Sequence, residues 1–140
     1  VASIMRKARC CIFVGVGDST YFCELLGKNM RCIDYNVQYY QQIHDMIYSV
    51  EHGNKDDALI IISARGQNER MIQLARRGKE KGMQVISITH MSENPLAKVA
   101  DYNLYFWGEN REVQGYNVTN RTGLMVLVRL LSEALWKGYE

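Results

Sequence analysis

Short runs of continuous apolar residues alternate along this chain with longer segments in which apolar residues recur every three or four positions. Continuous runs of branched side chains are typical of strands buried on both faces of a parallel sheet. Helical spacing predicts amphipathic helices that cover such a sheet. The predicted strands are residues 10–14, 31–33, 58–63, 85–89 and 101–106. The predicted helices are residues 4–8, a segment that follows Ser19, residues 37–49, residues 69–81, a short helix from Pro95, and residues 120–137.

Strands that alternate with helices in this way indicate a doubly wound α/β domain with a parallel sheet. A length of 140 residues suits one domain with a substantial core, and no linker or low-complexity stretch divides the chain. We therefore expect residues 1–140 to form a single domain. The net charge of +2 is too small to indicate nucleic-acid binding by this segment.

Three polar turns follow predicted strands, at residues 15–19, 34–38 and 63–68. The carboxyl ends of parallel strands meet at one edge of the sheet, and ligands bind beyond that edge, so these turns are expected to form one pocket. The turn at residues 63–68 leads into a helix, whose free N–H groups and positive dipole end suit a phosphate. The same pattern also fits an ordinary strand–helix connection, and the turn at residues 15–19 also fits simple helix capping.

Two segments of the C-terminal third suggest further roles. Residues 109–119 are polar without a clear period, and they could form a loop that reaches over the pocket. The last predicted helix has an apolar surface wider than one sheet-facing stripe, which indicates a partner, here a second copy of the chain.

The four cysteines, Cys10, Cys11, Cys23 and Cys32, form no C-x-x-C pair and have no histidine at zinc spacing. We expect small buried thiols in a reducing cytoplasm and no metal site. The longest apolar runs are far too short to span a membrane, so no membrane association is expected. Two matches to the glycosylation pattern, at Asn117 and Asn120, are interpreted as chance because no signal peptide precedes them.

Five segments in order resemble the sugar isomerase (SIS) domain, and most closely the effector half of RpiR-type transcriptional regulators. The segments are residues 12–19, 34–38, 61–66, 95–101 and 120–121. The resemblance implies a flavodoxin-like three-layer αβα sandwich with a five-stranded parallel sheet, a homodimer or higher homo-oligomer, and a sugar phosphate ligand. It also implies an N-terminal helix-turn-helix domain before Val1, through which alone the protein would contact DNA.

The family's phosphate loop reads roughly Ser-x-Ser-Gly-x-Thr. Ser63 and Gly66 match it, whereas Arg65 stands at the second serine and Asn68 at the threonine. Arg65 could replace the missing hydroxyls, since a guanidinium binds phosphate bidentately, or it could turn outward and leave the loop impaired. The expected phosphate contacts are Gly17, Ser19, Ser63, Arg65, Gly66, Gln67 and Asn68, and the possible sugar contacts are Asp34, Asn36, Gln38 and Glu109.

An isomerase of this family needs a positioned general base, for which Glu69, His90 and Glu109 are the candidates. None of them forms an evident acid–base pair in the sequence, so the favoured hypothesis is a sensor without catalytic residues or cofactor. In this hypothesis the sugar phosphate changes the DNA-binding state of a dimer. The alternatives are a sugar-phosphate isomerase or lyase, and a dimerisation module with an impaired phosphate loop.

Overall fold

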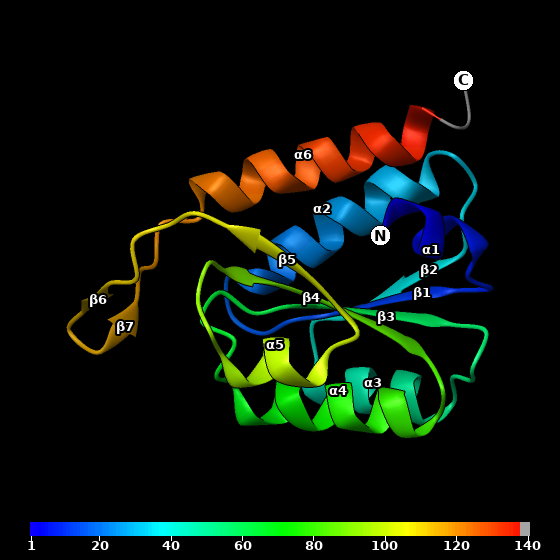
Figure 1. The fold of residues 1–140 in the computed structure, drawn as a ribbon, viewed down its shortest axis with the longest axis horizontal. Coiled ribbons are helices and arrows are strands. Elements are labelled where there is room, and N and C mark those ends of the chain that lie inside the picture. The colour runs from blue at the N-terminus through cyan, green and yellow to red at the C-terminus, as the bar shows by residue number, and fades with distance from the viewer. Residues whose placement is uncertain (138–140) are drawn as a thin grey trace.

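The computed structural model describes residues 1–137 and has a three-layer α/β architecture (Figure 1). The elements in chain order are α1 (Ala2–Lys7), β1 (Cys11–Val14), α2 (Ser19–Arg31), β2 (Val37–Tyr39), α3 (Ile43–Glu51), β3 (Ala58–Ile62), α4 (Glu69–Glu80), β4 (Gln84–His90), α5 (Pro95–Val99), β5 (Tyr102–Phe106), β6 (Glu112–Val113), β7 (Tyr116–Asn117) and α6 (Thr122–Lys137).

The main sheet has the strand order β2-β1-β3-β4-β5, and all of its neighbouring strands are parallel. The chain crosses from β1 to β2 on one side and then returns to β3 on the other side of β1. The strand order therefore reverses between β1 and β3, and the loops that follow these two strands diverge from adjacent positions. Ligands of open α/β sheets bind at such a point. The predicted fold class is confirmed.

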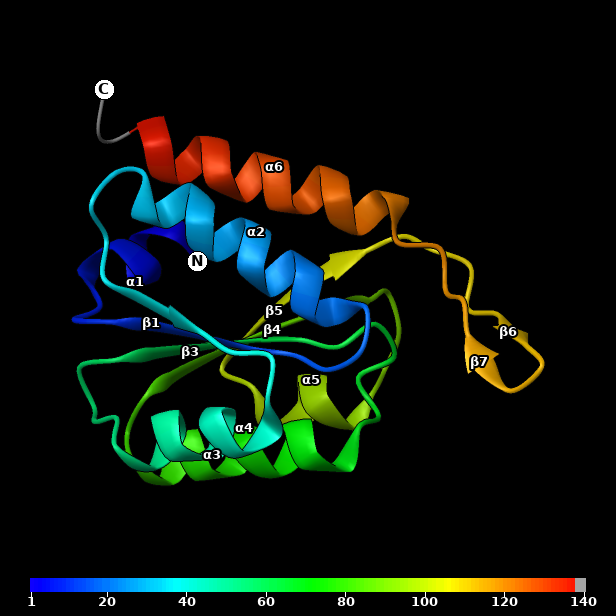
Figure 2. The same cartoon turned by 180° about the vertical axis from the view of Figure 1, so that it is seen from behind.

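Helices cover both faces of this sheet, as Figures 1 and 2 show from opposite sides: α1, α2 and α6 lie on one face, and α3, α4 and α5 on the other. Successive residues of a strand point to opposite faces, so each inner strand supplies two cores. Phe13 and Ile60 pack in the core beneath α2 and α6. Ile12 and Leu59 pack in the core beneath α3 and α4. All four are at most 1% exposed, as continuous apolar runs predict.

The predicted strand at residues 31–33 is wrong, and so is the helix start at residue 37. Helix α2 continues to Arg31 because Leu26 and Met30, four residues apart, both remain in the core at 0% exposure. The chain then turns through Asp34, which has a φ of 65°, and forms β2 at Val37–Tyr39. Helix α3 therefore begins only at Ile43.

The polar segment at residues 109–119 contains an antiparallel hairpin, in which Glu112 pairs with Asn117 and Val113 pairs with Tyr116. This β6–β7 hairpin projects from the body of the domain beyond the start of α6 (Figures 1 and 2). Within residues 1–137, none of the helices has both the length and the hydropathy that crossing a bilayer requires.

Candidate functional site

A cavity of about 340 Å³ lies where the strand order reverses, beyond the carboxyl ends of β1 and β3. The β1–α2 loop and the β3–α4 loop form its base, and the segment between β7 and α6 closes one side. Its lining residues are Val16, Ser19, Ser63, Ala64, Arg65, Gln67, Asn68, Asn117 and Arg121. The structure thus brings together the first and third of the three predicted turns, and it adds Asn117 and Arg121, which were not predicted as site residues.

The β3–α4 loop has its shape because of Gly66 and two asparagines. Gly66 has a φ of +66°, and a Cβ atom there would lie 2.0 Å from Oδ1 of Asn94. Asn94 is 2% exposed, and its Oδ1 accepts a hydrogen bond of 2.8 Å from the backbone N–H of Ala97 at the start of α5. Asn68 is the N-cap of α4, because its Oδ1 accepts a hydrogen bond of 3.1 Å from the N–H of Met71. The loop backbone is therefore fixed from both sides.

Two serine hydroxyls face the cavity from the two loops. Ser19 is the first residue of α2 and is 3% exposed, and Ser63 directly follows β3 and is 8% exposed. Gly17, with a φ of +60°, precedes α2 in the first loop. The N-terminal ends of α2 and α4 both lie at this edge, and each contributes the partial positive charge of its dipole. Hydroxyl donors beside helix N-termini form an environment that suits a phosphate.

Arg65 lines the cavity, and its guanidinium is paired with the hairpin segment. Its Nε donates a hydrogen bond of 2.9 Å to Oδ1 of Asn110, and its Nη2 lies 2.7 Å from Oε1 of Glu112. The side chain of Arg65 is 27% exposed. Arg65 thus lines the cavity and is paired with the hairpin segment at the same time, and both alternatives for its role in phosphate binding remain predictions.

Arg121 supplies a second guanidinium from the residue before α6. Its side chain is 14% exposed, its Nη1 donates a hydrogen bond of 3.0 Å to the carbonyl oxygen of Thr119, and the same nitrogen lies 3.6 Å from Oδ2 of Asp18. Among the described residues, Nε of Arg121 is the buried side-chain polar atom without a hydrogen-bond partner. A buried donor that lacks a partner is costly. In the sequence, Arg121 is marked only because residues 120–121 are the last of the five segments that resemble the SIS domain.

The predicted sugar contacts do not gather at this cavity. Asp34 and Asn36 precede β2 and so lie at the opposite, amino edge of the sheet, where the N–H of Cys11 donates to the carbonyl oxygen of Asn36 at 3.0 Å. The expectation that residues 34–38 share the pocket edge is wrong, because it depended on the misplaced second strand. Gln38 lies within β2 and accepts a hydrogen bond from Ser49 of α3. Glu109 is exposed at the base of the hairpin, where its carbonyl oxygen accepts a hydrogen bond of 3.0 Å from the N–H of Asn120.

The candidate acid–base residues lie apart from the cavity lining. Glu69 is exposed in the first turn of α4, and Nδ1 of His90 lies 3.2 Å from Oγ of Ser92 at the end of β4. The residues that line the cavity include no histidine and no carboxylate. Residues 1–137 contain no cluster of three or more His, Cys, Asp or Glu side chains that could hold a metal ion.

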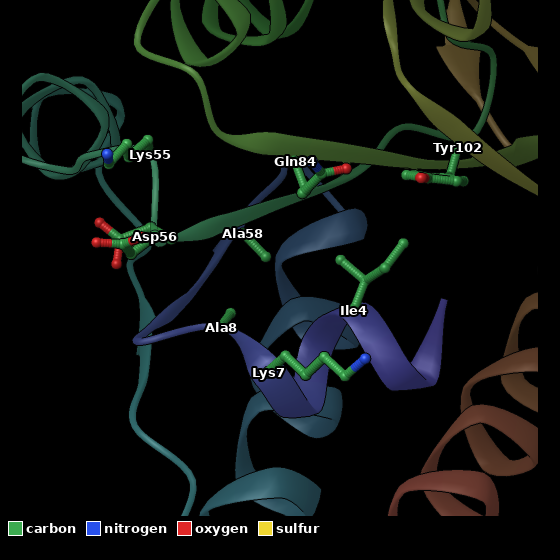
Figure 3. Close-up of a pocket in the computed structure, with 9 residues that line it drawn as sticks. Ile4, Lys7, Ala8, Lys55, Asp56, Ala58, Gln84 and Tyr102 are labelled. Atoms are coloured by element: carbon green, nitrogen blue, oxygen red, sulfur yellow. The ribbon is translucent and has the colours of Figure 1, made fainter.

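A second cavity, of about 360 Å³, lies at the opposite edge of the sheet between α1 and the strand starts (Figure 3). Its charged lining residues are Lys7 and Lys55 against Asp56 and Asp57. Asp57 is also held bidentately by Arg9, at 2.9 and 2.8 Å. The lining of this cavity therefore contains carboxylates as well as ammonium groups, whereas the lining of the cavity beside Arg65 and Arg121 contains no carboxylate.

A parallel α/β sandwich with a cavity at the reversal of strand order defines a class of doubly wound domains that bind ligands at that point. Within that class the chain belongs to the SIS domain family, whose family model matches residues 4–132. The HTH-type transcriptional regulator RpiR of Escherichia coli strain K12 is 25% identical over 120 residues, which cover 86% of this chain and 40% of that protein.

Other similar proteins include an enzyme and a solved regulator. The glutamine–fructose-6-phosphate aminotransferase of Sulfolobus acidocaldarius is 28% identical over 105 residues, which cover 72% of this chain and 17% of that protein. The structure of the Vibrio vulnificus NanR protein complexed with ManNAc-6P superposes with a TM-score of 0.84 at 19% identity, over 99% of this chain and 52% of that chain. The chain spans between 33% and 58% of the length of the curated HTH-type regulators that it matches.

Proposed function

We propose that this domain is the phosphosugar-sensing effector domain of an RpiR-type transcriptional regulator, and that the ligand changes the DNA-binding state of a dimer. The relatives named as HTH-type regulators support this role. The NanR protein, part of which has the same fold, is complexed with the phosphorylated sugar ManNAc-6P. In this proposal DNA is contacted only by a helix-turn-helix domain outside the present chain, and the regulator works in the cytoplasm.

The observation that carries the proposal is the cavity itself, which combines two buried serine hydroxyls and two guanidinium groups with no carboxylate in its lining. Ser19 and Ser63 would donate their hydroxyls to the phosphate. The backbone of the loop from Arg65 to Asn68 would add N–H groups at the positive end of α4. Arg121 would supply the positive charge of a guanidinium that lines the cavity.

The sugar would extend from the phosphate toward the hairpin base, where Glu109 remains our candidate for a hydroxyl contact. Asp34 and Asn36 lie at the other edge of the sheet and have no part in this arrangement, and Gln38 faces α3. Residues of the second subunit could complete this side of the cavity, because the proposed assembly is a homodimer.

A panel of sugar phosphates and the matching free sugars tests the proposal by thermal shift and calorimetry. We expect one or more phosphorylated sugars to raise the melting temperature at millimolar concentration and the free sugars to have no effect, because the phosphate is the group recognised. Arg121→Gln should weaken binding by roughly tenfold or more, since hydrogen bonds to charged groups contribute about 1.5–3 kcal/mol. Arg76→Gln, which removes an exposed arginine of α4, is the control and should bind normally.

Failure of every sugar phosphate to bind would contradict the proposal. Binding restored by Arg65→Ser together with Asn68→Thr would then identify a dimerisation module whose phosphate loop is impaired.

An isomerase or lyase is the second candidate function, and the position of Glu69 favours it. Glu69 directly follows the phosphate loop, within the first turn of α4, where a carboxylate is stabilised by the helix dipole. Conversion of an aldose or ketose phosphate by the domain, abolished by Glu69→Gln, would establish this alternative. We favour the sensor because the residues that line the cavity include no acid–base group.

A further inference from the structure

The phosphate loop and the β6–β7 hairpin are joined through a single side chain, Arg65. Its Nε donates to Oδ1 of Asn110 at 2.9 Å, and its Nη2 pairs with Oε1 of Glu112 at 2.7 Å. Both partners belong to the strand arm that leads into the hairpin, whereas Arg65 belongs to the loop that follows β3. Arg65, which stands where the family's loop has a serine, thus contacts the hairpin in this chain.

The same hydrogen-bond network reaches the second arginine of the cavity. Oγ1 of Thr119 lies 2.5 Å from Oδ1 of Asn117 and 3.0 Å from Oδ1 of Asn110, and the carbonyl oxygen of Thr119 accepts from Nη1 of Arg121 at 3.0 Å. Thr119 is only 3% exposed. Both guanidinium groups that line the cavity therefore contact the residues that flank the hairpin. A ligand that binds these guanidinium groups would compete with those contacts.

A carboxylate and a phosphate compete for the same face of a guanidinium, since both accept its paired N–H groups. The carboxylate of Glu112 is 50% exposed, and exposed ion pairs contribute little to stability. A phosphate in the cavity would carry more charge and would also meet the hydroxyls of Ser19 and Ser63. Displacement of Glu112 from Arg65 would therefore cost little stability.

We propose that Glu112 is an internal competitor for Arg65, so that a phosphate entering the cavity takes Arg65 from the hairpin and releases it. This inference rests on the proposed phosphosugar function. The hairpin projects from the domain (Figure 2), and it carries Val113 and Tyr116, which are 45% and 76% exposed. Its return strand leads directly into α6. Release of the hairpin therefore reports occupancy of the cavity to a surface that the ligand does not touch.

Removal of the competitor gives the first test. Glu112→Gln keeps the size of the side chain and removes the charge that competes for Arg65, so inorganic phosphate and the tightest-binding sugar phosphate of the panel should bind roughly two- to fivefold more tightly. Glu133→Gln removes an exposed carboxylate of α6, which is paired with Arg129, and is the matched control for long-range charge. An unchanged or weaker affinity for Glu112→Gln, relative to this control, would overturn the competition.

Hydrogen exchange of the hairpin gives the second test. The N–H of Val118 donates to the carbonyl oxygen of Arg111 at 2.8 Å, so exchange over residues 111–118 reports hairpin order. Saturating sugar phosphate should speed this exchange in the wild-type protein, and Arg65→Gln should show fast exchange with and without ligand. Tight binding that leaves the exchange unchanged would reject hairpin release and leave the proposed function intact. Absence of binding by every phosphorylated compound would reject both.

Discussion

Gly66 is the residue on which the geometry of the β3–α4 loop depends. Its φ of +66° disfavours any residue with a Cβ, and the space beside it is filled by the amide of Asn94. Asn94 cannot move without breaking its bond to the N–H of Ala97. Gly66→Ala should therefore lower the free energy of unfolding by about 2 kcal/mol or more, because backbone strain and a steric clash add together. Urea unfolding measures this change.

Gly17→Ala is the matched control for that substitution. Gly17 has a similar φ of +60°, but no heavy atom lies within 4 Å of the position that its Cβ would occupy. It should cost only the backbone strain, about 1 kcal/mol. Equal losses for the two variants would show that Asn94 accommodates the new methyl group and that the loop is less constrained than its contacts indicate.

The buried thiols predict a dependence of stability on alkaline pH. Burial raises the pKa of Cys11 and of Cys23 to about 12, and that of Cys10 to about 11, from an ordinary value of 9.0. The folded protein keeps these protons above pH 9, whereas the unfolded chain releases them. The unfolded state is therefore favoured as the pH rises, by up to about 1.4 kcal/mol per pH unit for each thiol.

Urea unfolding between pH 8 and pH 10 measures this decline, and single substitutions assign it. Cys23→Ala should flatten the dependence of the unfolding free energy on pH, because Cys23 is 2% exposed in the core. Cys32→Ala, which removes an exposed thiol, is the control for the substitution of a cysteine by alanine. A Cys23→Ala curve that runs parallel to that of the wild type would contradict the role of the Cys23 thiol.

At the scale of elements, α4 connects the loop to the fold through its N-cap. Asn68 caps the helix through the N–H of Met71, so Asn68→Ala should lower the free energy of unfolding by about 1 kcal/mol. Asn68→Thr should keep most of the stability, because threonine also caps helices, and it would restore the hydroxyl of the family's loop. Thermal unfolding of both variants tests this. Equal stability of Asn68→Ala and the wild type would show that the cap is energetically unimportant.

The inner elements could be predicted from the sequence because burial on both sides leaves a strong pattern. In β3, Ile60, Ile61 and Ile62 are all 0% exposed, and α4 has a regular apolar stripe that packs on the sheet. The edge strand β2 has no such pattern, because only Val37 of its three residues is buried. Ile33 and Cys32 resembled a strand more than Gln38 and Tyr39 did, and only the packing of α2 in three dimensions decides between them.

The site was predictable to the extent that its residues follow a strand directly. Ser19 and Ser63 were found in this way, and both line the cavity. Arg121 and Asn117 reach the cavity from the far end of the chain, after the hairpin, and no local pattern marks them. Asp34 and Asn36 were predicted at the carboxyl edge because the second strand was predicted before them, at residues 31–33. The strand in fact follows them, at Val37–Tyr39, so their turn lies at the amino edge.

At the scale of the whole molecule, α6 is the helix whose outer surface exceeds what the sheet requires. Its inner residues Leu124, Val128 and Leu135 are at most 1% exposed. Its outer residues Met125, Val126 and Leu130 are 49%, 54% and 61% exposed. Apolar side chains grouped on one exposed helix face are typical of a subunit interface, and the same face on two copies can form a two-fold dimer.

This face should therefore hold the proposed homodimer together. Val126→Asp combined with Leu130→Asp would place charges in the interface, where they lose hydration without gaining partners, so the protein should become monomeric. Size-exclusion chromatography with light scattering measures the mass of each form at micromolar concentration.

Arg129→Asp is the control, because it changes the charge of the same helix at an exposed residue that pairs with Glu133. It distinguishes a general effect of charge from a loss of apolar contact. A wild-type monomer, or a doubly substituted protein that stays dimeric, would exclude α6 as the interface. A dimer that survives in Arg129→Asp and separates in the double variant would locate the contact on the apolar face itself, so that the hairpin, the cavity and the interface all adjoin the N-terminal half of one helix.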